Sequence, residues 1–202
     1  MNDKTIELEL RAEVSQKNQE TLRASLEKIG VLHSHTKRLS IMYFGSIDTK
    51  KLDIRTRITN GECEVVVKSG SFGSHDRVEV VQNITPEQFL GFVKIFAQFD
   101  FVTKVGERET FNYTLPDNII ASFVFAGSIS YIEIEKMSSP GEVKQNNEHL
   151  KKVVEQLGLQ LLKSEEEFDN LCKRLDEEVD WSFHGSKEEY VKLGELLRRH
   201  KK

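Results

Sequence analysis

The sequence contains few cysteines and no long apolar run, and each absence excludes a class of protein. Only two cysteines, Cys63 and Cys172, occur in 202 residues, and they are too far apart to form a metal-binding pair. We therefore expect free thiols in a reducing cytoplasm rather than a disulfide framework. No apolar run approaches the length of a membrane span, and the polar residues 1–4 do not resemble a signal peptide. These features predict a cytoplasmic protein without a membrane partner.

Composition also argues against a nucleic-acid-binding surface and two common kinds of site. The net charge is −4, so basic residues that bind an anion must do so as a local cluster. The six histidines show no metal-ligand spacing, and we expect His33 and His35 in a polar loop. The glycine-rich residues 70–74 lack the Lys-Ser/Thr of a phosphate-binding loop and predict a surface loop.

The first strand-like segment, residues 5–14, alternates strictly between apolar and charged side chains. Because side chains on a strand alternate with a period of two, one face is apolar and the other is charged. The charged face carries Glu7, Glu9, Arg11 and Glu13. Carboxylates at positions i and i+2 point the same way, which allows them to bind one cation together.

A second acidic pair with the same spacing, Glu133 and Glu135, lies in the last strand-like segment. The charges of the segments between the two acidic pairs are mostly basic: Arg55, Arg57, Lys68, Arg77, Lys104 and Arg108. Arginine offers a planar fork to phosphate oxygens, and lysine offers a point charge. The pattern predicts one cavity that binds a divalent metal and a polyanion together.

Eight strand-like segments with two inserted helices predict an α+β fold built on a curved or closed antiparallel sheet. We expect the strands at residues 5–14, 39–44, 51–59, 63–69, 76–83, 101–115, 119–125 and 130–136. Asn60-Gly61 predicts a tight hairpin. The inserted helices are expected to begin near Ser15 and Thr85, with Pro86 and Gln88 favouring a capped start for the second. Glu62 and Glu64 are expected to be solvated strand charges.

The composition changes after a third expected helix, residues 142–157, which completes a first domain of residues 1–163. Residues 164–202 form a C-terminal helical appendage with few apolar residues. Ser164 and Ser186 open two capped helices within it. We interpret the appendage as a helical hairpin that packs on the domain or mediates a homodimer.

Five short motifs resemble the CYTH family, the triphosphate tunnel metalloenzymes. Residues 7–11 resemble the family's E-x-E-x-K opening strand, residues 52–57 its L-R-I-R strand, and residues 64–68 the next strand, which ends in lysine. Arg77-Val78-Glu79 resembles an R-x-E element, and residues 133–135 resemble the closing E-x-E. Their order and spacing agree from about residue 4 to residue 163. The resemblance implies an eight-stranded antiparallel β-barrel that forms a tunnel, with flanking helices.

The resemblance also implies a ligand, a metal and roles for single residues. The ligand would be tripolyphosphate or a nucleoside or thiamine triphosphate, bound with Mg²⁺ or Mn²⁺. The implied metal-site residues are Glu7, Glu9, Glu79, Glu133 and Glu135, with Glu79 alternatively organising the basic residues. The implied phosphate ligands are Arg11, Arg55, Arg57, Lys68, Arg77, Lys104 and Arg108. Glu7, Glu9 and Arg11 are the expected catalytic residues.

The sequence departs from the family pattern at several positions. Arg11 replaces a lysine, and Gly106 replaces the lysine of a K-x-R element, with Lys104 two residues earlier on the same face. The segments at residues 40–44 and 119–125 lack an aspartate that the family often has there. The loss of an acid removes a possible metal ligand or base, so reduced or absent activity stays open.

Four functions remain open from the sequence. The first is metal-dependent hydrolysis of inorganic triphosphate or a related organic triphosphate, as in the inorganic and thiamine triphosphatases. The second is a class IV type adenylate cyclase, which converts ATP to cyclic AMP and pyrophosphate. The third is a non-catalytic module that binds polyphosphate or nucleotide, and the fourth is a structural barrel with solvated charges.

Overall fold

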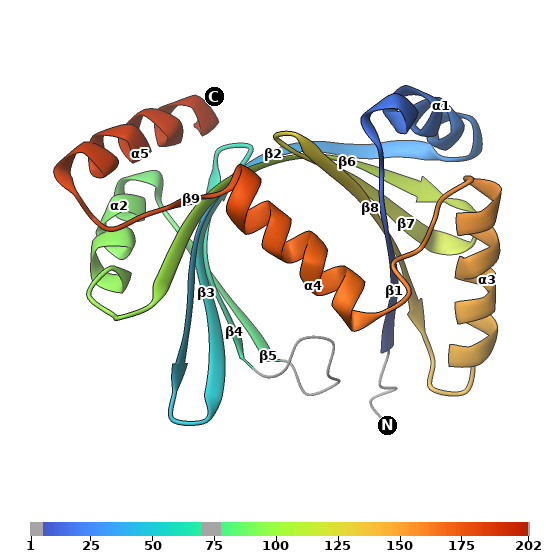
Figure 1. Ribbon diagram of the computed structural model, residues 1–202, viewed down its shortest axis with the longest axis horizontal. Helices are drawn as coiled ribbons and strands as arrows, with labels where there is room; N and C mark the ends of the chain where they lie inside the picture. Colours follow the sequence, from blue (N-terminus) through green and yellow to red (C-terminus); the bar gives the residue numbers. More distant parts are fainter. Residues whose placement is uncertain (1–5, 70–77, 202) are drawn as a thin grey trace. The chain divides into compact units, whose positions relative to one another are not determined.

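A computed structural model describes residues 6–69 and 78–201 of the chain (Figure 1). The helices are α1 (Gln19–Ile29), α2 (Pro86–Phe96), α3 (Val143–Gln156), α4 (Glu165–Arg174) and α5 (Lys187–His200). The strands are β1 (Ile6–Glu13), β2 (Val31–Ile47), β3 (Lys50–Thr59), β4 (Glu62–Ser69), β5 (Val78–Ile84), β6 (Val102–Leu115), β7 (Ile119–Ala126), β8 (Ile129–Ser138) and β9 (Trp181–Ser182). Short 3₁₀ turns at Gln16–Asn18 and Pro116–Asn118 and a π-helical turn at Leu175–Val179 complete the described elements.

The strands form one sheet in the order β1-β8-β7-β6-β2-β3-β4-β5, and the short β9 pairs with β6. The strand pairings for which a register is defined are antiparallel. The predicted α+β class and the eight long antiparallel strands are therefore confirmed. In the described part of the chain β1 and β5 are the end strands of this path, so its pairings do not close the sheet into a complete barrel.

The hairpin between β3 and β4 turns at the predicted Asn60-Gly61 step. Both residues have positive φ, 48° and 91°, which is the conformation that a tight two-residue hairpin requires. The turn sets a register in which Arg57 is opposite Glu64 and Asp53 is opposite Lys68. Pairing across β3 and β4 therefore brings charges of opposite sign together.

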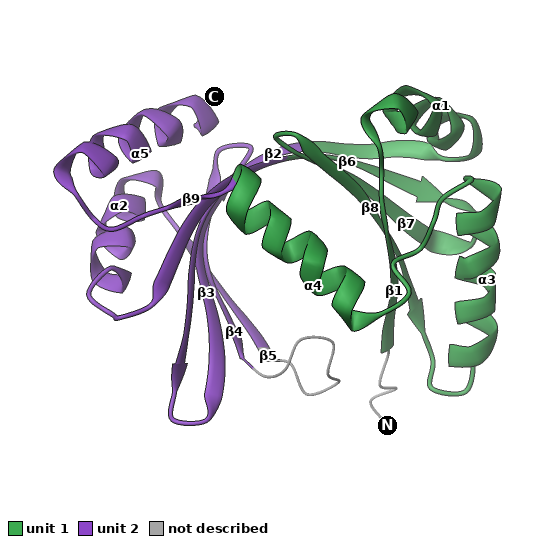
Figure 2. Cartoon of the chain, viewed as in Figure 1, with its two compact units in different colours: residues 1–35, 109–179 green, residues 36–108, 180–202 purple. Residues whose placement is uncertain are grey.

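The chain divides into two compact units (Figure 2). Unit 1 comprises residues 1–35 and 109–179, and unit 2 comprises residues 36–108 and 180–202. The unit boundaries after residues 35 and 108 lie within the long strands β2 and β6. Each of these strands therefore contributes one end to each unit.

The core of unit 1 lies between the apolar face of its strands and the helices α1 and α3. Ile132 and Ile134 of β8 and Phe123 of β7 are fully or almost fully buried. They pack in one cluster with Leu26 of α1 and Leu150 of α3. Because these strand residues alternate with the charged ones, the helices cover the apolar face and leave the opposite face to Glu9, Arg11, Glu133 and Glu135.

The core of unit 2 is built in the same way, with α2 and α5 on the apolar face of the strands. Ile58 of β3 and Val105 of β6 pack with Phe89 of α2 and Leu193 of α5, and all four are fully buried. The predicted capping box at Thr85 and Gln88 is present at the start of α2. The opposite face of these strands carries Asp53, Arg55, Arg57, Lys68 and Arg108.

One local expectation was wrong, and another is not tested. His33 and His35 lie in β2 rather than in a loop. His35 stacks on Phe111 of β6 at 4.3 Å and makes a 2.7 Å hydrogen bond with Glu109, so contacts with a neighbouring strand order a segment whose composition is polar. The glycine-rich residues 70–74, expected to form a surface loop, lie outside the described residues.

The C-terminal appendage is not a helical hairpin of its own. Helix α4 belongs to unit 1, whereas β9 and α5 belong to unit 2. Trp181 and Ser182 extend the chain and pair with Val105 and Lys104 of β6, which separates the two helices. The domain boundary at residue 163 stays a prediction. No helix in the described ranges is both long and apolar enough to cross a bilayer.

Candidate metal and polyanion site

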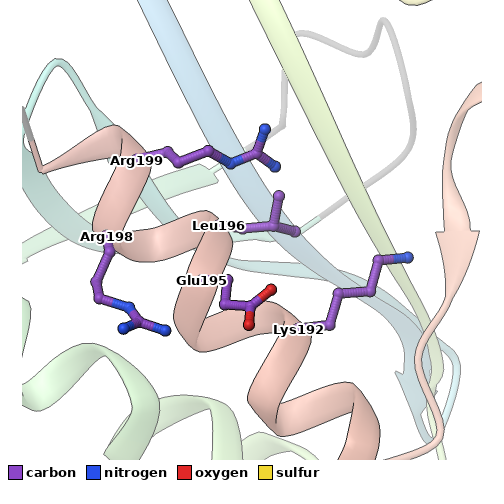
Figure 3. A pocket seen from close by; sticks show the side chains of 5 residues that line it. All are labelled: Lys192, Glu195, Leu196, Arg198 and Arg199. Carbon is purple, nitrogen blue, oxygen red and sulfur yellow. The ribbon is translucent and has the colours of Figure 1, made fainter.

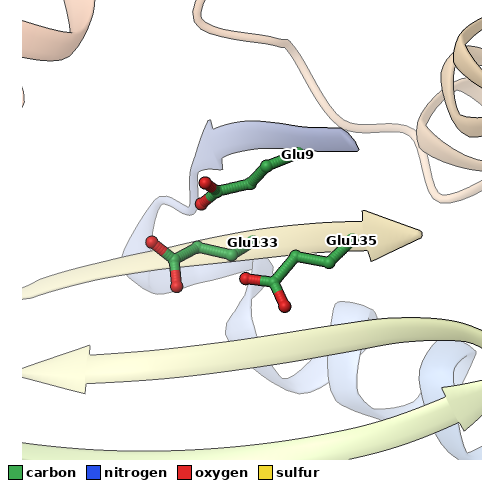
Figure 4. Close-up of side chains that lie close together, drawn as sticks. All are labelled: Glu9, Glu133 and Glu135. Carbon is green, nitrogen blue, oxygen red and sulfur yellow. The ribbon is translucent and has the colours of Figure 1, made fainter. Parts of the chain in front are cut away.

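Three carboxylates gather on the polar face of unit 1. Glu9 of β1 and Glu133 and Glu135 of β8 each place one oxygen within 4.8 Å of the others (Figure 4). The antiparallel register puts Glu9 directly opposite Glu135 and Arg11 directly opposite Glu133. Like charges in directly opposed positions destabilise a sheet. The arrangement is therefore unfavourable in the absence of a cation.

Burial and mutual repulsion change the acidity of two of these groups. Burial raises the pKa of Glu9 from its ordinary 4.5 to about 8, opposed by Arg11 and reinforced by the charges of Glu133 and Glu135. Burial likewise raises the pKa of Glu135 to about 7, with further contributions from Glu133 and Glu7. At neutral pH the cluster therefore holds protons that a bound cation would displace.

Arg11 partly neutralises the cluster. Its guanidinium lies 2.5 Å from Glu9 through Nη2 and donates from Nε to Glu133 at 3.0 Å. Burial alone would lower the pKa of Arg11, but the charges of Glu9 and Glu133 outweigh it and raise the pKa. Once the bound protons are displaced, three carboxylates and one arginine leave an excess of negative charge, which favours cation binding.

Helix α4 contacts two residues on the polar face of β1 next to this cluster. The ring of Phe168 lies 4.4 Å from the guanidinium carbon of Arg11, and Arg174 donates to Glu13 at 2.7 Å. Ser164 caps the helix by accepting from the Glu167 amide at 3.2 Å. The appendage therefore contributes an aromatic side chain directly to the surroundings of a predicted catalytic residue.

The donor set fits a hard divalent cation. All three members offer carboxylate oxygens, the ligands that Mg²⁺ and Mn²⁺ prefer, and no softer ligand joins them in the described part of the chain. The side chains of Glu9 and Glu133 are 27% and 25% exposed, so neither is fully buried. Glu9, Glu133 and Glu135 are the residues that would hold such an ion.

The other two predicted metal-site residues lie outside this group. Glu7 is on β1 two residues before Glu9, and its charge raises the pKa of Glu135. Glu79 belongs to unit 2, where it is opposite Lys68 in the β4–β5 pair and forms a 2.8 Å ion pair with it. Its described environment agrees with the alternative role of organising a basic residue.

In unit 2 four of the predicted phosphate-binding residues lie beside a carboxylate: Arg55, Arg57, Lys68 and Arg108. Arg55 binds Asp53 through two hydrogen bonds, at 2.8 and 2.7 Å, and Arg57 binds Glu64 at 2.5 Å. The Arg57 and Glu64 side chains are 13% and 20% exposed. Glu64 is therefore a partly buried partner of Arg57 and not the solvated charge that we expected.

Arg108 is held by a residue of the appendage. Its guanidinium donates to both carboxylate oxygens of Asp180, at 2.7 and 2.8 Å, and the Asp180 side chain is only 2% exposed. Lys104 lies on the same face of β6, opposite Ser182 of β9. Arg77 lies outside the described residues.

The sequence analysis missed Asp53, Glu64, Asp180 and Phe168. The register of the predicted hairpin already implied that Arg57 would be opposite Glu64, and the i, i+2 spacing placed Asp53 beside Arg55. The unexpected glycine at position 106 is the one sequence feature related to Asp180, because it leaves room for the Asp180 carboxylate. No signal in the sequence pointed to Phe168 as a neighbour of Arg11.

A pocket on the surface of α5 is separate from these groups. It is lined by Lys192, Glu195, Leu196, Arg198 and Arg199, all from one helix (Figure 3). Arg198 donates to the Gly194 carbonyl at 3.2 Å, and Arg199 lies 3.8 Å from Glu107. None of the predicted site residues lines it.

No known protein-family profile matches the chain, and no curated protein sequence matches it. Solved structures do resemble it. The PH1012 protein of Pyrococcus horikoshii OT3 has a TM-score of 0.58 at 18% identity, covering 77% of this chain and 92% of that protein. A putative adenylate cyclase from Vibrio parahaemolyticus has a TM-score of 0.56 at 15% identity, covering 92% and 97% of the two chains.

A third similar structure carries a functional description. A putative adenylyl cyclase from Hippeastrum, reported to reveal a dominant triphosphatase activity, has a TM-score of 0.53 at 18% identity. It covers 80% of this chain and 91% of that protein. The chain therefore shares its fold with these structures, and the predicted resemblance is confirmed at the level of the fold. A likeness at this level of identity shows the fold alone, so activity, substrate and metal must be argued from the residues.

Proposed function

We propose that this chain hydrolyses inorganic triphosphate or a related organic triphosphate with the help of Mg²⁺ or Mn²⁺. The observation that carries the proposal is the like-charged pair Glu9 and Glu135, directly opposed on neighbouring strands with Glu133 beside them. Such a pair costs stability in a purely structural sheet. A divalent cation would convert the repulsion into a shared binding site.

The proposed chemistry divides between acidic and basic residues. Glu9, Glu133 and Glu135 would hold the metal, which when bound neutralises charge on phosphate and favours attack by water. Arg11 contacts two of these carboxylates and keeps their orientation fixed. Glu7 adds negative charge beside Glu135.

The basic residues would bind the phosphates. A linear triphosphate carries several negative charges, and arginine side chains bind its oxygens in a bidentate manner. Arg55, Arg57 and Lys68 supply three cations along one face of β3 and β4. Their carboxylate partners hold the guanidinium groups in place before ligand arrives, which lowers the ordering cost of binding. Arg77 and Lys104 remain proposed phosphate ligands on the basis of the resemblance.

A non-catalytic polyanion-binding module is the second candidate, and one observation favours it. Ser122 of β7 lies opposite Glu133, in the strand where the family often has an aspartate. The strand Ile119–Ala126 contains no acidic residue that could serve as a further ligand or base. Binding without turnover would agree with this composition.

The test is a product analysis over a panel of triphosphates. Tripolyphosphate, ATP and thiamine triphosphate are incubated with the chain in Mg²⁺ or Mn²⁺, and orthophosphate, pyrophosphate and cyclic AMP are quantified. The proposal expects metal-dependent release of orthophosphate, abolished by EDTA and reduced at least a hundredfold by Glu133→Gln. If cyclic AMP and pyrophosphate form instead of orthophosphate, the chain is an adenylate cyclase and the proposal of hydrolysis is wrong. If tripolyphosphate binds but no product forms, the chain is a non-catalytic binding module.

A further inference from the structure

The carboxylate of Asp180 binds the guanidinium of Arg108 through two oxygens, as a phosphate would. Both of its oxygens accept from the two terminal nitrogens of Arg108, at 2.7 and 2.8 Å. The side chains are 2% and 17% exposed, so the pair is largely shielded from water. Carboxylate and phosphate present the same kind of paired oxygens to an arginine fork. Arg108 is one of the residues that we predict to bind phosphate.

The backbone places Asp180 at this point. Ser182 pairs with Lys104 and Trp181 pairs with Val105, so the next position of the same register sets Asp180 beside Gly106. The amide of Phe183 donates to the Thr103 carbonyl at 3.0 Å and extends the same alignment. A residue two positions further along β6 is within diagonal reach of Asp180, and that residue is Arg108.

Gly106 makes room for the carboxylate. A Cβ at position 106 would lie 2.2 Å from Oδ1 of Asp180 and 2.8 Å from Nη1 of Arg108. No side chain larger than hydrogen fits while Asp180 holds Arg108. The glycine that departs from the family pattern and the carboxylate from the appendage therefore belong to one arrangement.

Asp180 differs from the carboxylates beside the other basic residues. Asp53, Glu64 and Glu79 lie on the long strands β3, β4 and β5. Asp180 instead lies in the appendage, between a π-helical turn that ends at Val179 and the two-residue strand β9. It accepts from both terminal nitrogens of Arg108, whereas Asp53 accepts from Nε and Nη2 of Arg55.

We propose that Asp180 is an internal competitor for phosphate at Arg108 and thereby limits how tightly the chain binds a triphosphate. This inference rests on the proposed function. In the wild-type chain Arg108 contributes little to binding, because a ligand must first displace a buried carboxylate. Removing the charge of Asp180 removes this competitor, so that a phosphate can accept from the terminal nitrogens of Arg108, of which Nη1 also donates to the Glu107 carbonyl at 3.0 Å.

The experiment is calorimetric titration of the full-length chain with tripolyphosphate, at low salt, with and without Mg²⁺. The variants are Asp180→Asn, Arg108→Gln and the double variant. Glu177→Gln removes one negative charge from an exposed position of the appendage and serves as the control. We expect Asp180→Asn to bind about tenfold more tightly, which corresponds to about 1.4 kcal/mol, and Glu177→Gln to bind as the wild type does. The gain should vanish in the double variant, and Arg108→Gln alone should change the affinity less than threefold.

Each outcome decides between the alternatives. Equal affinity of wild type and a folded Asp180→Asn, judged by circular dichroism, shows that the pair only attaches β9 to β6 and overturns the inference. A large loss in Arg108→Gln alone also overturns it, because Arg108 would then already bind ligand. Tight binding by Asp180→Asn together with weak or absent binding by wild type supports it. If neither chain binds tripolyphosphate, the proposed function fails and the inference fails with it, whereas wild-type binding without a gain in Asp180→Asn rejects the inference alone.

Discussion

Glu9 of β1 and Glu135 of β8 are directly opposed in an antiparallel pair, and both have raised pKa values. Two glutamates in this relationship repel each other, and Arg11 relieves only part of the repulsion. When both groups are ionised, this repulsion lowers the stability of the metal-free chain. A divalent cation at the proposed site would relieve it.

Replacing Glu135 by Gln removes one charge and preserves the size of the side chain. We expect the metal-free protein at pH 8 to gain about 0.5–1 kcal/mol in its free energy of unfolding, because a like-charged pair is abolished. Activity should fall about a hundredfold or more, since a charged ligand contact is worth a few kcal/mol, and raised Mn²⁺ should restore part of it. Urea denaturation and initial rates measure the two effects. Glu62→Gln, at an exposed strand position, should change neither, and unchanged turnover in Glu135→Gln would remove this residue from the site.

The stability of the metal-free chain should depend on pH with a defined sign. The folded pKa values of Glu9 and Glu135, about 8 and about 7, lie above the ordinary 4.5. Between these limits the folded state binds more protons than the unfolded state, so stability is highest below pH 4.5 as far as these groups are concerned and falls as pH rises toward 8. Thermal melts in EDTA from pH 5 to pH 8.5 measure this fall. Adding Mg²⁺ at pH 8 should reverse it, and the Glu9→Gln/Glu135→Gln variant should show a flatter profile; an equally steep profile would refute the assignment.

Alternation and turn chemistry predicted most of the fold. The strict period of two in β1 and the Asn60-Gly61 turn each predict a register, and the structure has the same registers. β2 was predicted too short, because its first residues are polar and are ordered by contacts of His35 with Phe111 and Glu109 of another strand. β9 was missed because two residues are too few to show any periodicity.

The sequence predicted those site residues whose place follows from their alternation on a strand. Glu9, Glu133 and Glu135 come together because the sequence gives them the same phase on strands that the structure pairs. The partners of the basic residues required the register itself, and Asp180 required the path of the appendage. Phe168 reaches Arg11 only through the docking of α4, which no local pattern encodes.

Gly106→Ala should destabilise the chain by about 1–3 kcal/mol, because its Cβ overlaps the Asp180–Arg108 pair. Gly91→Ala provides the control, since nothing lies within 4 Å of a Cβ at that helical position. The control should stabilise α2 by about 0.5–1 kcal/mol. Denaturant titrations compare the two, and an Asp180→Ala background should reduce the cost of Gly106→Ala. An equal cost in both backgrounds would show that Asp180 does not require the glycine.

Tripolyphosphate should raise the melting temperature of the wild-type chain, because a ligand of the folded state alone stabilises it. The ligand-induced shift should shrink in Arg57→Ala and in Lys68→Ala, which remove proposed phosphate ligands, and should be retained in Lys201→Ala, on the last turn after α5. Each shift is referred to the melting temperature of the same variant without ligand, since loss of Arg57 also leaves Glu64 without its partner. No shift at millimolar tripolyphosphate would count against every triphosphate function.

The binding of Mn²⁺, followed by electron paramagnetic resonance, tests the central claim most directly. Titrating the wild-type chain at pH 8 should remove the signal of free Mn²⁺ with saturation at one ion per chain. Glu133→Gln should bind at least tenfold more weakly, because one of three converging carboxylates is neutralised, and Glu62→Gln should bind like the wild type. Saturable binding that Glu133→Gln weakens is the predicted result. Either no binding at millimolar Mn²⁺ or equal affinity in wild type and Glu133→Gln would contradict the account.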